Sequence, residues 1–165
     1  KTFSIIHATT QDDTNLVVWL DADVVTHTAV PENFVEGIHP TECHVSYLGR
    51  DNNYSECGFV IYNTKHPHHQ EFMDVWRNLY TTDDVFKLPQ WHDSYVFDTI
   101  RLSLEKKYNF LNNNLTPWGK DYDHVFINSF LGDYMDHLKG DRKVEGKSSK
   151  KDIIQGRKSN SDYWK

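Results

Sequence analysis

Cysteine is scarce in this chain of 165 residues, and no apolar run extends beyond the five residues Leu16–Leu20. Two cysteines, Cys43 and Cys57, permit one disulfide at most and exclude a disulfide-rich scaffold. A run of five residues is far too short to cross a bilayer, so we expect no membrane span. The net charge of -6 and the pI near 5.9 argue against a general nucleic-acid-binding protein.

The sequence does contain enough apolar material for one packed domain. Hydrophobic residues make up 38% and aromatic residues 14% of a 19.4 kDa chain, as in globular proteins of single-domain size. The two cysteines are interpreted as small buried hydrophobes. Residues 1–11 have the pattern of an amphipathic helix that leads into a buried strand, so we expect the chain to be the C-terminal portion of a longer domain. No targeting sequence is visible, which favours a cytoplasmic location.

The spacing of apolar residues changes along the chain and predicts both strands and helices. The run Leu16–Leu20 predicts a strand buried on both faces. Phe72, Val75, Trp76 and Leu79 recur at helical spacing and predict a helix over residues 66–80. We also expect one or two helical turns at 31–38, a helix at 90–107, strands at 44–48, 58–62 and 108–111, and a loop at 112–123. This alternation places the chain in the α/β class.

Two interpretations stay open for residues 127–138. The apolar residues there match a helix, whereas Gly132 would end such a helix early and leave a short strand at 134–138. Residues 139–158 carry eight Lys/Arg against three Asp/Glu, so positive charge gathers near the C-terminus. A segment with this composition would suit a flexible loop that closes over a diphosphate.

Asp21-Ala22-Asp23 directly follows the first predicted strand. Carboxylates at positions i and i+2 of an extended segment point the same way. The carboxyl edge of an open α/β sheet is also where such folds bind their ligands. Two oxygen ligands in that place suit Mg²⁺ or Mn²⁺. The alternative interpretation is an acidic turn that caps the strand.

A second group of candidate residues lies between His137 and Lys143. Imidazole suits Mn²⁺ better than Mg²⁺. Gly140 permits a tight turn or a close approach to phosphate, and Lys143, with Arg142 and Lys139, offers positive charge to phosphate oxygens. The alternative is a histidine in a basic surface segment.

Three further histidines lie close together in His66-Pro67-His68-His69. They invite a metal-binding interpretation, but no set of carboxylates or thiols is near them in the sequence. Pro67 also fits the start of a helix. We therefore expect a solvated helix terminus here.

Taken together, the two candidate groups resemble motifs of glycosyltransferases with the GT-A fold. The likeness is to the metal-dependent retaining type, of which glycogenin, galactinol synthase and xyloglucan xylosyltransferases are examples. In that family an Asp-x-Asp follows an apolar strand, and a late His-x-x-Gly-x-x-Lys provides a further metal ligand and a lysine for the diphosphate. Residues 56–63 resemble the family's glycine-led strand ending in Asn, and 91–94 occupy the place of its acidic segment.

The resemblance implies a fold and a reaction. The fold would be a GT-A-like mixed, mostly parallel sheet flanked by helices, with a catalytic portion at 1–143 and a basic, polar tail at 144–165. The reaction would transfer a sugar from a nucleotide-diphosphate-sugar donor to a hydroxyl of a saccharide or other acceptor. It would depend on Mn²⁺ or Mg²⁺.

The resemblance also assigns roles to single residues around the metal and the diphosphate. Asp21, Asp23 and His137 would be metal ligands, and Asp21 would in addition bind the ribose or the donor sugar. Gly140 and Lys143 would hold the diphosphate of the donor.

Two more residues receive roles beside the reacting sugar. Gly58 would leave room for the donor sugar. Asp93 would bind the sugar hydroxyls or flank the anomeric carbon. There it would stabilise charge in a retaining reaction or deprotonate the acceptor in an inverting one.

The sequence departs from the family in two places. Lys143-Val144-Glu145 stands where the family often has Lys-Pro-Trp, which weakens the assignment of the phosphate contact. The family's N-terminal units, which hold the base and ribose, have no counterpart before Lys1, so the metal and sugar half is what the sequence contains. Two alternatives remain. One is a degenerate or truncated carbohydrate- or nucleotide-binding domain without turnover, and the other is an enzyme similar to sugar nucleotidyltransferases.

Overall fold

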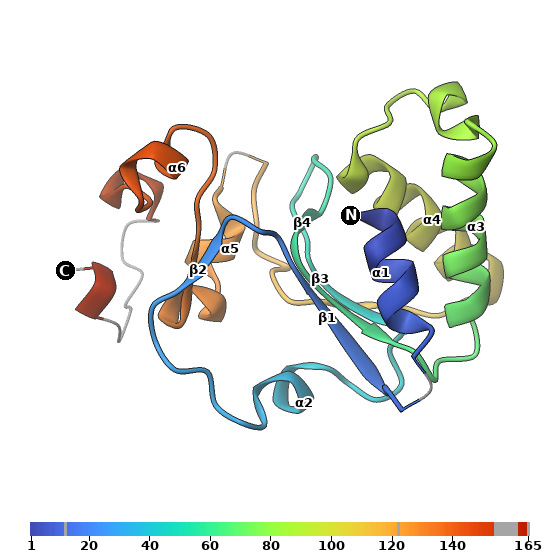
Figure 1. Ribbon diagram of the computed structural model, residues 1–165, viewed down its shortest axis with the longest axis horizontal. Coiled ribbons are helices and arrows are strands. Elements are labelled where there is room, and N and C mark those ends of the chain that lie inside the picture. The colour runs from blue at the N-terminus through green and yellow to red at the C-terminus, as the bar shows by residue number, and fades with distance from the viewer. Residues whose placement is uncertain (12, 122, 154–161, 165) are drawn as a thin grey trace.

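The computed structural model describes residues 1–11, 13–121, 123–153 and 162–164. Its strands are β1 (Leu16–Leu20), β2 (Val24–Thr26), β3 (Val45–Leu48), β4 (Glu56–Asn63), β5 (Asn113–Asn114) and β6 (Met135–His137). Its α-helices are α1 (Thr2–Thr9), α2 (Phe34–Ile38), α3 (His69–Thr81), α4 (Asp93–Tyr108), α5 (Val125–Asn128) and α6 (Arg142–Glu145). A four-stranded sheet has the order β1-β4-β3-β5, and β2 and β6 form a separate two-stranded sheet (Figure 1).

The strand directions correct part of the predicted architecture. The combination of helices with a mixed sheet is confirmed, but β1 pairs with β4 and β4 with β3 in antiparallel fashion, and β3–β5 is the parallel pair. A mostly parallel sheet was therefore the wrong expectation. The segment 49–55 that joins β3 to β4 contains no crossover helix, and short connections of this kind produce antiparallel neighbours.

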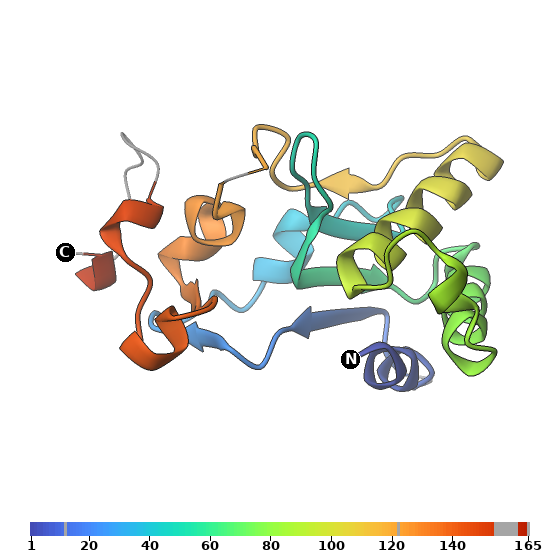
Figure 2. The same ribbon diagram turned by 90° about the horizontal axis from the view of Figure 1, so that it is seen from above.

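The position of β1 corrects a second expectation. In the described part of the chain β1 lies at one edge of the sheet, and its residues are half-buried or exposed rather than buried on both faces. The edge strand can be apolar along its whole length because α1 packs against it, as the view from above shows (Figure 2). In the same view β2 continues from β1 toward α6 and the C-terminal residues.

Two hydrophobic clusters cover the two faces of β4. Val60 and Tyr62 pack with α1, α3 and α4, whereas Phe59 and Ile61 pack with α5 and the residues that follow it. This alternation is the period of two that an extended strand imposes on its side chains. In Figure 1 α1, α3 and α4 lie on one side of β4, and α5 lies on the other.

The helices predicted at 66–80 and 90–107 are confirmed as α3 and α4, each with slightly shifted ends. The apolar face of α3 includes Phe72, Met73 and Trp76, while Val75 remains 39% exposed. The solvated terminus expected at residues 66–69 is wrong for His69, which is buried with its Nδ1 3.0 Å from Nε2 of the buried His44. Both cysteines are free and buried, as expected.

The strand predicted at 108–111 is wrong, because the strand forms later in the chain and is held there by side-chain amides. α4 continues to Tyr108, and the strand β5 forms later, at Asn113–Asn114. Asn112 Oδ1 accepts a hydrogen bond from the backbone N–H of Val45, at 2.8 Å, and Asn114 Oδ1 accepts one from Gly49, at 3.0 Å. These polar contacts attach the segment to β3, and a search for apolar alternation does not detect them.

Near the C-terminus the structure selects one of the two open interpretations. α5 and a 3₁₀ turn at Phe130–Asp133 precede the strand β6, so the helix does not continue through residue 138. The described part of the 144–165 segment packs onto this region, since Trp164 is buried and its Nε1 donates to Gly132 O at 2.6 Å. Within the described ranges, no helix is both long enough and apolar enough to span a membrane.

Candidate functional site

The carboxylates of Asp21 and Asp23 lie in the turn between β1 and β2. The backbone N–H of Val24 donates to Asp21 O at 3.1 Å, so the pair is not extended as the i, i+2 argument assumed. The turn nevertheless brings the two side chains to one place. Trp19 Nε1 donates to Asp21 Oδ1 at 2.6 Å and orients that carboxylate, and both side chains remain about one-quarter exposed.

His137 joins this pair from the far end of the sequence. Residue 137 pairs with Val24 in the small β2–β6 sheet, which places the buried imidazole beside the Asp21–Asp23 turn. His137 Nε2 lies 3.1 Å from Asp23 Oδ1 and 3.8 Å from Asp21 Oδ2. One ligand atom from each of the three residues lies within 4.8 Å of the others. The residues predicted to hold a metal are therefore brought together by the fold, and we call them the Asp–His cluster.

The chemistry of the Asp–His cluster fits a divalent cation. Burial lowers the pKa of His137, and the attraction of Asp23 and Asp21 offsets this only in part, so the ring is neutral at pH 7. Burial raises the pKa of Asp23, but the hydrogen bond from Lys143, together with smaller favourable interactions of the carboxylate, outweighs it and lowers the pKa overall. Two carboxylate oxygens and a neutral imidazole nitrogen are a donor set that could hold a divalent cation.

Gly58 and Glu56 lie beneath the histidine ring. A Cβ at residue 58 would lie 2.5 Å from His137 Cε1, so the absent side chain makes room for the imidazole. The family resemblance implied instead that Gly58 leaves this space for a donor sugar. Glu56 Oε1 accepts from Gly58 N–H at 3.1 Å and lies 3.6 Å from His137 Nδ1, a buried nitrogen that makes no hydrogen bond to the described residues. These two residues fix the position of the ring.

Two lysines neutralise the carboxylates of the cluster. Lys143 Nζ lies 2.9 Å from Asp23 Oδ2, and Lys1 Nζ lies 2.9 Å from Asp21 Oδ1. Lys1 also contacts Asp93 Oδ2 at 2.7 Å and so connects the start of α4 with the Asp–His cluster. Burial raises the pKa of Asp93, but the hydrogen bond and charge of Lys1 together with the backbone N–H of Ser94 outweigh it and leave the pKa below the usual value. Asp93 is therefore a carboxylate at neutral pH.

Gly140 has a backbone φ of 56°, in the left-handed region that glycine adopts without steric cost. A Cβ there would meet no atom within 4 Å of the described structure. The glycine is therefore explained by the turn into α6, which places Lys143 beside Asp23. Its predicted contact with a phosphate remains a prediction.

Sequence reasoning missed Lys1 and Glu56. Lys1 gave no signal, because its contacts with Asp21 and Asp93 depend on how α1 packs beside the sheet. Glu56 did give one, since it lies two residues before Gly58 in the same strand and such residues share a face.

Comparison of the chain with protein-family models, with curated proteins and with solved structures finds no match in any of the three.

Proposed function

We propose that this chain is a metal-dependent glycosyltransferase domain that uses a nucleotide-diphosphate-sugar donor and an acceptor hydroxyl. The observation that carries the proposal is the convergence of Asp21, Asp23 and His137 from sequence positions more than 110 residues apart. Lys143, the lysine expected to hold the diphosphate, lies against the same carboxylate as the histidine. A simple acidic turn does not account for a buried neutral imidazole directed at two carboxylates.

The Asp–His cluster would hold Mn²⁺ or Mg²⁺ through Asp21, Asp23 and His137. When bound, such an ion neutralises charge on the departing diphosphate. Lys143 is exposed over more than half of its side chain, and its ion pair with Asp23 is of the weak, partly solvated kind. When Asp23 binds the metal ion, the ammonium group of Lys143 could therefore leave Asp23 and contact a phosphate oxygen.

In the transfer itself, the bond between the anomeric carbon and the diphosphate oxygen breaks, and its electron pair stays on the diphosphate. A bond from the acceptor hydroxyl oxygen to the anomeric carbon forms, and the hydroxyl proton passes to the departing phosphate. Asp93 has a lowered pKa and is a weak base. This favours a role in stabilising positive charge on the sugar over removal of the acceptor proton.

Thermal unfolding with Mn²⁺ and a panel of nucleoside diphosphates tests the proposal. Ligand at about 100 times its Kd adds roughly 2.7 kcal/mol to the free energy of unfolding. For a domain of this size that corresponds to a rise in Tm of roughly 5–11 °C. We expect one nucleotide to give this rise only with metal, and Asp23→Asn and His137→Gln to abolish it.

Matched controls are Asp74→Asn and His7→Gln, which change an exposed carboxylate and an exposed imidazole outside the cluster. They should respond as the unaltered chain does. Stabilisation by metal without any nucleotide effect would support the alternative of a binding domain without turnover. No response to metal or nucleotide would contradict the proposal.

A further inference from the structure

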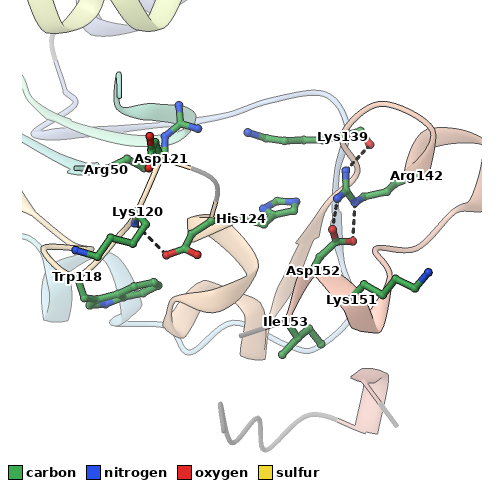
Figure 3. A pocket seen from close by; sticks show the side chains of 11 residues that line it. Arg50, Trp118, Lys120, Asp121, His124, Lys139, Arg142, Lys151, Asp152 and Ile153 are labelled. Carbon is green, nitrogen blue, oxygen red and sulfur yellow. Dashed lines mark hydrogen bonds and ion pairs between the residues drawn. The ribbon is translucent and has the colours of Figure 1, made fainter. Parts of the chain in front are cut away.

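A cavity of about 740 Å³ is lined by the side chains drawn in Figure 3. Its walls come from three separate parts of the chain, which contribute Arg50, the segment 118–124 and the segment 139–153. Five Lys or Arg side chains line it against three Asp, although the whole chain carries a net charge of -6. A positive cavity in an acidic protein indicates an anionic ligand.

Most of the cations at this cavity are already paired. Arg142 makes two contacts with Asp152, Lys139 contacts Glu56, and Lys120 lies 2.5 Å from Asp51. Arg50 differs from them. Its Nε donates to Tyr54 O at 2.8 Å, but within the described ranges no carboxylate lies at ion-pair distance from its guanidinium. Asp98 and Asp121 attract Arg50 from beyond ion-pair distance, so in the described structure its guanidinium still has donors available for a ligand carboxylate or phosphate.

The cavity is also connected to the candidate site. Lys139 reaches toward Arg50 in Figure 3 and contacts Glu56, the carboxylate beneath His137. His124 lines the cavity, and its Nε2 lies 2.9 Å from His137 O. The cavity therefore lies on the Nδ1 side of His137, whereas Asp21 and Asp23 lie on the Nε2 side. Lys139 and Arg142, which the sequence also assigned to phosphate oxygens, line this cavity and contact Glu56 and Asp152, whereas Lys143 lies beside Asp23.

Trp118 adds an apolar surface to this charged cavity. Its side chain lines the wall and is 41% exposed. An exposed indole face packs well against the flat apolar face of a sugar ring. A guanidinium that makes no ion pair with the described residues and an exposed indole in one cavity suit a ligand that combines an anionic group with a ring.

We propose that this cavity binds a sugar that carries a phosphate or carboxylate group, with Arg50 at the anionic group and Trp118 at the ring. This assignment builds on the proposed function, in which such a sugar is the acceptor.

Titration calorimetry at low salt, without metal or nucleotide, tests the assignment with glucose 6-phosphate, glucuronate, glucose and inorganic phosphate. We expect at least one acidic sugar to bind tenfold or more tightly than glucose, and the preferred one identifies the anionic group. Arg50→Gln should weaken that binding roughly 10- to 100-fold, since it removes charge-assisted hydrogen bonds. Arg50→Lys, which keeps the charge but not the planar fork, should weaken it less. Trp118→Ala should weaken acidic-sugar binding and leave phosphate binding unchanged.

Arg77→Gln, at an exposed arginine of α3, is the matched control and should bind as the unaltered chain does. Equal affinities for glucose and the acidic sugars, or an unchanged affinity in Arg50→Gln with an unchanged Tm, would overturn the proposal. So would phosphate binding as tight as glucose 6-phosphate binding. Because no metal or nucleotide is present, these results are independent of whether the Asp–His cluster binds them.

Discussion

Two clusters of charged side chains in this molecule are built in opposite ways. In the first, Asp98 accepts hydrogen bonds from both the N–H and the hydroxyl of Ser55, each at 2.7 Å. Arg101 pairs with Asp98 at 2.9 Å and with Glu105 at 3.0 Å, and its guanidinium lies 4.2 Å from the ring centroid of Tyr47. All three charged side chains are nearly buried, so this cluster is closed and its partners are complete.

The Asp–His cluster is open and incomplete by comparison. Asp21 and Asp23 are about one-quarter exposed, and their partners Lys1 and Lys143 are more exposed than Arg101. His137 Nδ1 is buried and makes no hydrogen bond to the described residues. The contrast teaches that the closed cluster fixes one conformation, whereas the open one has contacts that a ligand can replace.

The largest expected effect breaks the closed cluster. Arg101→Met leaves Asp98 and Glu105 buried without their counter-ion, and loss of one partner from a buried pair costs about 3–5 kcal/mol. Urea unfolding should show this loss as a lower midpoint. Arg77→Met removes an exposed pair with Asp74 and should cost no more than about 1 kcal/mol. Similar losses in the two variants would mean that the closed cluster does not stabilise the fold.

The two clusters also differ in how far the sequence predicts them. Asp21, Asp23 and His137 could be selected because their residue types and order follow a known chemical pattern. In the closed cluster, Asp98, Arg101 and Glu105 have the spacing of ion pairs within one helix. Ser55, by contrast, meets Asp98 only when α4 packs against β4. Contacts between distant segments depend on tertiary packing, which local periodicity does not encode.

Dependence on tertiary packing also separates the parts of the fold that the sequence predicts from those that it missed. α3 and α4 follow from a helical period that is written in local sequence. The direction of the strands depends on connections, and β5 depends on side-chain amides of Asn112 and Asn114. Lys1 was missed because it meets Asp93 across 92 positions of the sequence.

The buried histidine pair of His44 and His69 offers the next comparison, because burial lowers the pKa of both rings. Burial, with a smaller contribution from His66, lowers the pKa of His69 to about 4, and burial also lowers that of His44. The unfolded chain takes up the proton near the ordinary pKa of about 6.5, whereas the folded chain resists it. Stability is therefore complete above that value and falls as the pH decreases toward 4.

For His69 alone the loss between pH 7 and pH 5 is about 2 kcal/mol. Urea unfolding at several pH values should show it, and His69→Gln should have a shallower pH dependence than the unaltered chain. His7→Gln, which changes an exposed histidine of α1, should keep the original dependence. Identical slopes in all three proteins would show that His69 is not the titrating group.

The smallest expected change concerns Glu56, which lies beside His137 of the Asp–His cluster. Glu56 acts on the Asp–His cluster only through His137, at the loose distance of 3.6 Å between Oε1 and Nδ1. Outer partners of metal ligands typically change affinity 10- to 100-fold, and the long contact favours the lower value, about tenfold or 1.4 kcal/mol, for Glu56→Gln. Titration with Mn²⁺ measures this change, with Glu71→Gln on α3 as the partly exposed control.

Glu56→Gln also removes the ion pair of Lys139, so its free energy of unfolding is measured in parallel. A lower Mn²⁺ affinity at an unchanged free energy of unfolding would make Glu56 a positioning residue for His137. A loss of stability at an unchanged affinity would show instead that Glu56 belongs with Asp98 and Arg101 among the residues that only stabilise the fold.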